Sequence, residues 1–185
     1  EGGMIVTNSK SLAKYVMTAR NHGITKTLAQ RYSHGKPWDY EMSESGYNYR
    51  LDEIRSALGL SQLKRIKKLN ALRKTVFEYY NKKLKDINGL ITPLSATDNE
   101  HAYHLYILRV KKDCNVSRDE LFKRLWQYGI RTSAHYKPLH RFNVFKNCKG
   151  RTKDLRNSDQ LYEEILSLPF YPNLSRTQQN YVINC

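Results

Sequence analysis

The longest regular pattern in the chain is a helical repeat of apolar residues that begins after Asp52. Apolar side chains recur mostly at steps of three and four as far as Leu84, the spacing that places them on one face of an α-helix. Asn88 and Gly89 then supply a helix-ending signal. At ~1.5 Å per residue such a helix would be roughly 50 Å long. A helix longer than a small domain is wide typically links two domains or lies along a subunit interface.

Ahead of this helix the pattern is shorter and then disappears. The apolar, β-branched run 3–7 predicts a strand. Asn8 or Ser9 can cap a helix that runs to about Arg20 and ends before Gly23. Residues 24–49 show no period and are rich in Gly, Pro, Ser, Trp and Tyr. A long irregular segment with this many aromatic residues is more typical of a functional loop than of disorder.

After residue 100, predicted strands and helices alternate. Strands are expected at 104–110, 130–136 and 168–171, the first of them central because it is largely apolar. Helices are expected at 155–166 and after two capping boxes, in which Ser117 faces Glu120 and Ser175 faces Gln178. The polar, basic run 143–154 predicts a surface loop. The alternation indicates a small α/β domain.

The formal net charge of +15 permits binding to nucleic acid or to small anions. The basic residues are spread over the chain, and the densest run, 64–68, lies within the long helical pattern, where a solvated helix face is the favoured interpretation. Three cysteines at long spacings indicate reduced thiols, with neither a disulfide framework nor a metal site. We see no transmembrane run and no signal peptide, and a start without methionine leads us to expect a preceding segment.

Several side chains have polar groups that could bind a ligand, but on the residues alone ordinary structural roles explain them equally well or better. Asn48 and Arg50 can donate hydrogen bonds to a phosphate, although an Asn after Gly46 is also an ordinary turn residue. His135 and Tyr136 are neighbours on a predicted strand, so that one side chain is expected to face the core and the other the solvent. Tyr47 lies in the irregular segment, where aromatic residues can line a ligand pocket or anchor a loop.

Six segments, taken in order, resemble one family over nearly the whole chain. They are GGMIVTN (2–8), RNHGI (20–24), GYNYRL (46–51) with EI (53–54) and ALGL (57–60), HLY (104–106), HYKPLH (135–140), and EEILSLP (163–169) with YP (171–172). This set is similar to the DegT/DnrJ/EryC1/StrS family of pyridoxal-phosphate (PLP) dependent sugar aminotransferases.

The resemblance implies an α/β fold, namely the C-terminal part of a fold type I, aspartate-aminotransferase-like PLP transferase. Residues 1–51 would form the end of the large PLP-binding domain, 52–89 the long linking helix, and 90–185 the small C-terminal domain. The family transfers an amino group from an amino acid, usually glutamate, to a keto sugar carried on a nucleotide. Its lysine that holds PLP would precede Glu1, so we expect no catalytic residue in this chain and no activity of the chain alone.

The resemblance also implies site residues and partners. Asn48 would reach the PLP phosphate of the other subunit of a homodimer, with Arg50 beside it. His135, Tyr136, His140 and Tyr47 would face the nucleotide sugar, and no metal is expected. The implied location is cytoplasmic, with no membrane partner. Two alternatives remain open: a basic nucleic-acid-binding module, and a remnant that retains only dimerisation or regulation.

Overall fold

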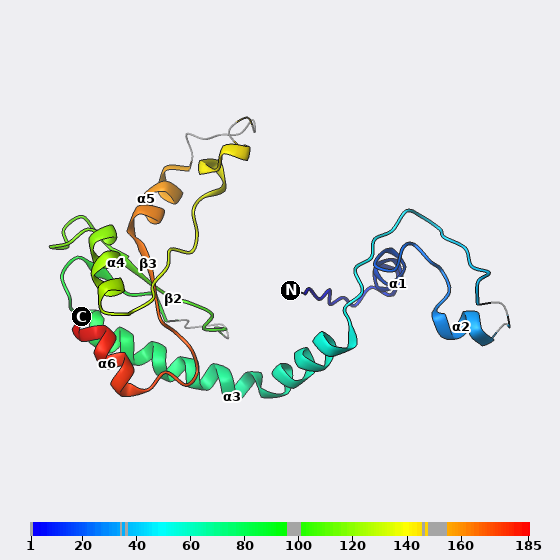
Figure 1. The fold of residues 1–185 in the computed structure, drawn as a ribbon, viewed down its shortest axis with the longest axis horizontal. Coiled ribbons are helices and arrows are strands. Elements are labelled where there is room, and N and C mark those ends of the chain that lie inside the picture. The colour runs from blue at the N-terminus through cyan, green and yellow to red at the C-terminus, as the bar shows by residue number, and fades with distance from the viewer. Residues whose placement is uncertain (1, 34, 36, 96–100, 146, 148–154) are drawn as a thin grey trace. The chain divides into compact units, whose positions relative to one another are not determined.

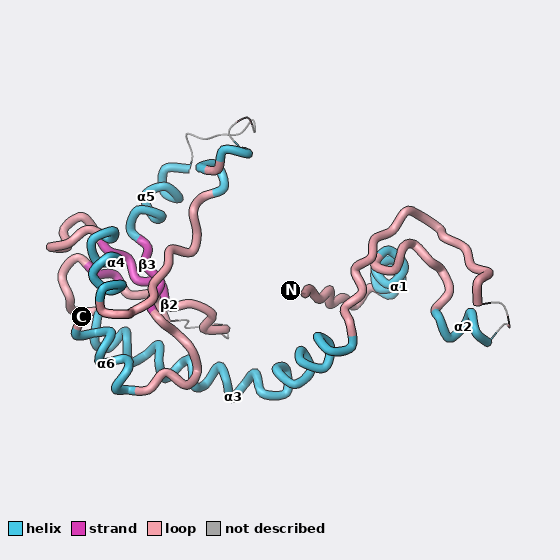
Figure 2. The backbone as a smooth tube through the Cα atoms, in the orientation of Figure 1, coloured by secondary structure: helices cyan, strands magenta, loops and turns pink. Residues whose placement is uncertain are grey.

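A computed structural model describes residues 2–33, 35, 37–95, 101–145, 147 and 155–185. The chain divides into two compact units, residues 1–64 and residues 65–185. Within the described residues, no helix is long and apolar enough to cross a membrane. Figure 2 shows that loops make up much of the first unit, whereas the second combines helices with a sheet.

The first unit begins with an extended segment followed by helix α1 (Lys10–Ala19). The Ser9 hydroxyl caps this helix by accepting a hydrogen bond from the Leu12 amide, as the sequence predicts. The predicted strand 3–7 is wrong for this structure, because no described strand pairs with it, and Met4 and Val6 are 83% and 90% exposed. An extended run becomes a strand only when a partner satisfies its backbone groups.

The segment after α1 folds back on itself and carries a short helix that the sequence pattern missed, α2 (Leu28–Ser33). Isolated antiparallel bridges join Ile24 to Met42 and Asn21 to Asn48. Two glycines allow this return. Gly23 has φ +78°, and a Cβ added there would lie 2.0 Å from the Glu44 carbonyl oxygen, while a Cβ on Gly46 would lie 2.3 Å from the Gly23 nitrogen. Backbones that meet this closely leave no room for a side chain.

Helix α3 (Glu53–Leu84) contains 32 residues and runs from the first unit into the second. The predicted long helix is therefore confirmed, although it ends before Asn88. Asp52 opens it, with Oδ1 accepting a hydrogen bond of 2.9 Å from the Arg55 amide. Its buried residues all lie near its C-terminal end, namely Val76, Phe77, Tyr80 and Leu84.

The second unit is built on an antiparallel sheet in the order β1-β2-β3, formed by β1 (Leu90–Ile91), β2 (Tyr106–Val110) and β3 (Ile165–Leu168). β2 is the central strand, as its apolar sequence predicts. Its residues alternate between buried and partly buried, whereas all four residues of β3 are buried. Tyr106 pairs with Leu168, and Arg109 pairs with Ile165.

The core of the second unit joins the sheet to the last part of α3. Tyr80 and Tyr106 are fully buried, with ring centroids 4.8 Å apart, and Phe77 meets Tyr106 edge-on. Helix α6 (Arg176–Asn184) runs beside α3, where the Gln179 side-chain amide donates a hydrogen bond of 2.9 Å to the Val76 carbonyl (Figure 1). Burial raises the pKa of both Tyr80 and Tyr106, so these phenols remain neutral.

Both predicted capping boxes are present. Ser117 and Glu120 open α4 (Arg118–Gln127), and Ser175 and Gln178 open α6. The predicted helix 155–166 is too long, because α5 (Arg156–Glu164) stops where β3 begins. The predicted strand 130–136 is wrong as well, since only Ser133 forms a bridge there, to Ser167.

Two short 3₁₀ helices, η1 (Leu139–Arg141) and η2 (Asn143–Phe145), lie between that segment and α5. Of the predicted surface loop 143–154, only 143–145 and 147 fall within the described residues. Cys148 lies outside them too, while Cys114 and Cys185 are free thiols.

Candidate functional sites in the two units

Asn48 and Arg50, the predicted phosphate ligands, lie in a short extended segment, residues 47–50, which we call the strip. The strip pairs with the residues that follow α1. The Tyr49 amide donates to the Arg20 carbonyl at 2.8 Å, and the His22 amide donates to the Tyr47 carbonyl at 2.9 Å. These bonds enclose the bridge between Asn21 and Asn48. The structure therefore brings together two segments of the family-like sequence, RNHGI and GYNYRL.

Arg50 is fixed by the same contact between the two segments. Its Nη1 donates a hydrogen bond of 2.8 Å to Oδ1 of Asn21. Side chains alternate along an extended strip, and the rings of Tyr47 and Tyr49 stack on one side with centroids 4.9 Å apart. Alternation places Asn48 and Arg50 on the other side, where both are exposed. An amide donor and a guanidinium on one side suit the oxygens of a phosphate.

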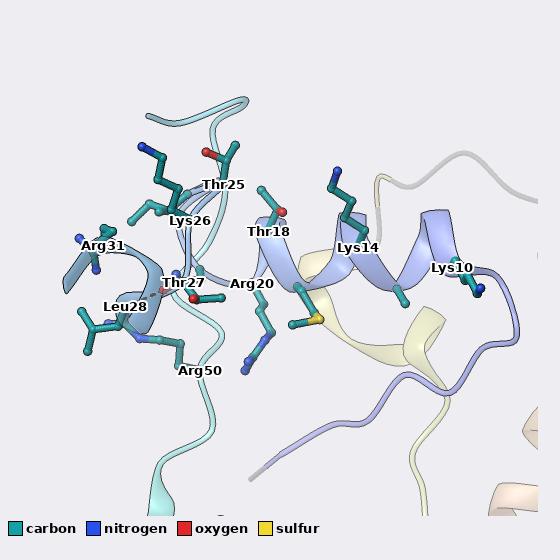
Figure 3. Close-up of a pocket in the computed structure, with 14 residues that line it drawn as sticks. Lys10, Lys14, Thr18, Arg20, Thr25, Lys26, Thr27, Leu28, Arg31 and Arg50 are labelled. Atoms are coloured by element: carbon teal, nitrogen blue, oxygen red, sulfur yellow. Dashed lines mark hydrogen bonds between the residues drawn. The ribbon is translucent and has the colours of Figure 1, made fainter. Parts of the chain in front are cut away.

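A pocket of about 760 Å³ lies beside this strip, entirely within the first unit. Figure 3 shows Arg50 entering from the strip, below Thr27 and Leu28, with Lys10 and Lys14 further along α1. Arg50 and Asn21 line the pocket, whereas Asn48 does not. The remaining lining residues are Lys10, Ala13, Lys14, Met17, Thr18, Arg20, Ile24, Thr25, Lys26, Thr27, Leu28 and Arg31.

In the second unit, His135 and Tyr136 differ in burial, but they do not face opposite sides of a strand, because residues 130–136 form none and the two rings are in contact. His135 is partly buried, and its Nδ1 lies 2.8 Å from Oγ of the buried Ser167. Tyr136 is 70% exposed, and its ring stands nearly perpendicular to the imidazole with centroids 4.7 Å apart. The Ser133 bridge to Ser167 fixes the backbone just before this pair.

His140 makes a separate contact. Its Nε2 lies 2.8 Å from Oδ1 of Asp159 on α5, and the same oxygen accepts a hydrogen bond of 2.5 Å from Arg141. Arg141 also binds Glu163. The hydrogen bonds from Arg141 and then His140 hold the pKa of Asp159 below its usual value. These contacts tie η1 to α5.

A buried carboxylate lies at the end of α5. Burial alone would raise the pKa of Glu164, but hydrogen bonds from Lys111, Gln160 and Arg109 outweigh it and lower the pKa to about 2. The Lys111 ammonium and the Arg109 guanidinium each approach a Glu164 oxygen to 2.7 Å. This charge network joins β2 to α5 and is structural.

Sequence reasoning missed Asn21 as a partner of Arg50 and missed the basic residues around the pocket. The signal for Asn21 was present in RNHGI, but the pairing of that motif with GYNYRL appears only in three dimensions. Among the described residues, no group of three or more His, Cys, Asp or Glu side chains could hold a metal ion.

The comparisons with known proteins agree on one family. The model of the DegT/DnrJ/EryC1/StrS aminotransferase family matches residues 1–185. The spore coat polysaccharide biosynthesis protein SpsC of Bacillus subtilis (strain 168) is 36% identical over 186 residues, which cover 99% of this chain and 48% of SpsC. The chain spans about half the length of the curated relatives that it matches.

Solved structures extend this likeness to the fold. DesV of S. venezuelae, solved in complex with a ketimine intermediate, is 28% identical with a TM-score of 0.82, covering 97% of this chain and 44% of DesV. The PLP form of Spr1654 from Streptococcus pneumoniae is 25% identical with a TM-score of 0.81, covering 98% and 44%. The predicted fold class, part of a fold type I PLP-dependent transferase, is confirmed. The chain belongs to the DegT/DnrJ/EryC1/StrS aminotransferase family.

Proposed function

We propose that this chain is the C-terminal portion of a PLP-dependent aminotransferase that transfers an amino group from an amino acid to a keto sugar carried on a nucleotide. The family's usual donor, glutamate, is the proposed donor here. The observation that carries the proposal is the family match over the whole chain, 1–185. SpsC, named for its part in spore coat polysaccharide biosynthesis, supports a role in making polysaccharide, lipopolysaccharide or antibiotic sugars.

Residues 1–51 would complete the large domain, 52–89 would form the linking helix, and 90–185 would form the small domain. The enzyme would act as a homodimer in the cytoplasm. The lysine that binds PLP would belong to the preceding part of the protein, so that the chain alone would be inactive. We refer below to the protein that includes this lysine-bearing segment as the complete enzyme.

Asn48 and Arg50 would hold the phosphate of PLP. When bound, PLP supplies an electron sink for the reacting carbon. The Asn48 amide would donate to a phosphate oxygen, and the Arg50 guanidinium would add a charge-assisted hydrogen bond. What supports these roles is their shared, exposed side of the strip and the hydrogen bond that fixes Arg50 to Asn21. Because this bond already holds the guanidinium, a phosphate placed there would need little rearrangement of Arg50.

His135, Tyr136, His140 and Tyr47 would contact the substrate. The Ser167 contact leaves Nε2 of His135 as the ring atom that can meet a sugar hydroxyl or a phosphate. Tyr136 offers an exposed phenol beside it. His140 would act together with Asp159, because their contact of 2.8 Å orients the imidazole. Tyr47 would present its ring, stacked on Tyr49, to the sugar.

The test is an absorbance spectrum with added PLP, recorded for the chain alone and for the complete enzyme. We expect the absorbance of lysine-bound PLP only in the complete enzyme, and its loss in the Asn48→Ala variant at limiting PLP. Asn70→Ala is a matched control, because Asn70 lies on α3, where its Oδ1 accepts a hydrogen bond of 3.2 Å from Arg73. A folded complete enzyme without this absorbance would contradict the proposal and indicate a remnant without catalysis.

A further inference from the structure

The half of α3 that belongs to the second unit carries a large excess of positive charge. Residues 65–84 contain one acidic residue, Glu78, whose Oε1 lies 3.8 Å from Nζ of Lys74. The same stretch contains seven basic residues, which are Arg65, Lys67, Lys68, Arg73, Lys74, Lys82 and Lys83. Helix α6 runs beside this half of α3 and contains one arginine and no acidic residue (Figure 1). A surface with this excess attracts acidic groups.

One face of this half of α3 continues onto α6, and we call it the α3–α6 surface. Side chains three or four positions apart share one face of a helix. By this spacing the surface consists of Lys68, Leu72, Thr75, Tyr79 and Lys83 on α3, with Arg176 and Asn180 on α6. The two helices meet where the Tyr79 hydroxyl donates a hydrogen bond of 2.5 Å to Oδ1 of Asn180. Tyr79 is partly buried, and the other residues of the surface are exposed.

The Tyr79 ring holds two of the cations. The Arg176 guanidinium lies 3.8 Å from the centre of this ring, and the Lys83 ammonium lies 5.8 Å from it. Nη1 of Arg176 also donates a hydrogen bond of 3.2 Å to Oε1 of Gln179, which is 1% exposed. Because the guanidinium is already held in place, binding a partner there costs less side-chain entropy than ordering a free arginine.

These two cations have no counter-charge. Within the part of the chain that the structure describes, no salt bridge involves Lys83 or Arg176. A guanidinium that lies against an aromatic ring can still bind a carboxylate through two N–H groups in its own plane. The arrangement is therefore suited to the carboxylates of Asp and Glu side chains.

We propose that the α3–α6 surface docks an acidic segment of a protein partner, with carboxylates against Lys83 and Arg176 and, further along α3, against Lys68. Leu72 and Thr75 lie between these cations and offer contact area. Tyrosine and arginine are among the residue types that dominate the binding energy of protein interfaces. Lys68 and Lys83 are about 22 Å apart along the helix, a span of about seven extended residues of the partner. The proposal goes beyond the function proposed above, which gives this surface no role.

Nucleic acid is the competing partner, and the state of Tyr79 argues against it. Sites for single-stranded nucleic acid combine basic residues with aromatic rings on which the bases stack. Tyr79 is the aromatic residue of this surface, and a cation of the protein already lies 3.8 Å from the centre of its ring. A base could stack on that side of the ring only by displacing Arg176. A carboxylate needs no such displacement.

The test is the fluorescence anisotropy of a labelled poly-L-glutamate peptide, long enough to reach from Lys68 to Lys83, titrated with the 185-residue chain. Physiological ionic strength screens weak attraction between exposed charges. The surface variant is Lys83→Gln with Arg176→Gln. A single-stranded oligothymidylate is the comparison ligand.

The matched control is Lys123→Gln with Arg131→Gln. Both residues are exposed and lie outside the α3–α6 surface, and the pair loses the same charge. Arg131 also lies against an aromatic ring, 4.1 Å from the centre of Trp126. A third variant, Tyr79→Leu, keeps every charge and removes the ring that holds the two cations. Circular dichroism checks that each variant is folded, and the two charge variants decide the outcome if Tyr79→Leu does not fold.

We expect the peptide to bind about tenfold more weakly to the surface variant and with unchanged affinity to the control. Tyr79→Leu should weaken binding about threefold, because the cations are no longer held. No peptide binding, equal loss in the control, or wild-type affinity of folded Tyr79→Leu would each overturn the proposal. An oligothymidylate that binds more tightly than the peptide and depends on Lys83 and Arg176 would overturn it in favour of nucleic acid.

Discussion

Arg50 and Asn21 are 29 positions apart in the sequence, and Nη1 of the arginine donates a hydrogen bond of 2.8 Å to Oδ1 of the asparagine. The bond joins the strip that carries Asn48 to the residues that follow α1, next to the β-bridge between Asn21 and Asn48. Asn21 thereby acts as a positioning residue, because it holds the guanidinium without belonging to the proposed phosphate ligands.

Asn21→Ala is therefore expected to weaken PLP binding by the complete enzyme about threefold to tenfold, since one net hydrogen bond is worth ~1 kcal/mol. The measurement is a PLP titration followed by absorbance. Asn21→Asp would keep an acceptor for Arg50 and should retain more of the affinity than the alanine variant. An alanine variant with wild-type affinity would show that the contact plays no part in binding.

Glu164→Gln should lower the free energy of unfolding of the second unit by roughly 2–3 kcal/mol at pH 7, because a buried carboxylate then no longer meets Arg109 and Lys111. The pKa of this carboxyl is lower in the folded state, about 2 against a reference value of 4.5. Its contribution is then complete above about pH 4.5 and is lost as the pH falls toward 2.

Urea unfolding can follow this loss through Trp126 fluorescence in a Trp38→Phe background, at pH 7 and pH 3. Glu78→Gln is the control, because Glu78 is 60% exposed and lies 3.8 Å from Lys74. It should change stability by less than about 0.5 kcal/mol. A Glu164 effect as large at pH 3 as at pH 7 would contradict the assigned ionisation.

Phe77→Ala should destabilise the second unit by about 3–5 kcal/mol, since Phe77 is 1% exposed and meets Tyr103 and Tyr106 edge-on. Leu63→Ala, on the same helix, should change the stability of the isolated chain little, because Leu63 is 67% exposed. Thermal unfolding of both variants gives the comparison. Equal effects would mean that the first half of α3 is buried in solution.

Ser167→Ala should raise KM for the nucleotide sugar more than it lowers kcat in the complete enzyme, because His135 loses the hydroxyl that orients its imidazole. Affinity for PLP should stay unchanged, and Ser167→Thr should restore part of the loss. A purely structural role for Ser167 would instead lower stability and leave KM as it was, which thermal unfolding of the same variants detects.

Local sequence signals predicted the parts of the fold that depend on neighbours in the chain. The capping boxes at Ser117 and Ser175 involve residues three apart, so both helix starts were predictable. The strands predicted at 3–7 and 130–136 failed because strand pairing depends on distant segments. Ile165 and Leu166 fit the period of a helix equally well, and only their pairing with β2 makes them a strand.

The candidate site also has parts that neighbouring residues predict and parts that depend on distant segments. Asn48 and Arg50 are two positions apart, so their common side follows from the extended backbone. Their contact with Asn21, and the gathering of Lys14, Lys26 and others around one pocket, depend on the closure of the segment between them. Residues 24–49 have no regular pattern, so their sequence does not predict that this segment folds back on itself.

The close approach of Gly23 and Gly46 has an evolutionary consequence. Because the backbone is pinned at both glycines and at the Ile24–Met42 bridge, the loop between them can gain or lose residues without shifting Asn48. Doubling a flexible loop costs only about 0.6 kcal/mol of closure entropy. The length of this loop can therefore change while the segment that carries Asn48 keeps its register.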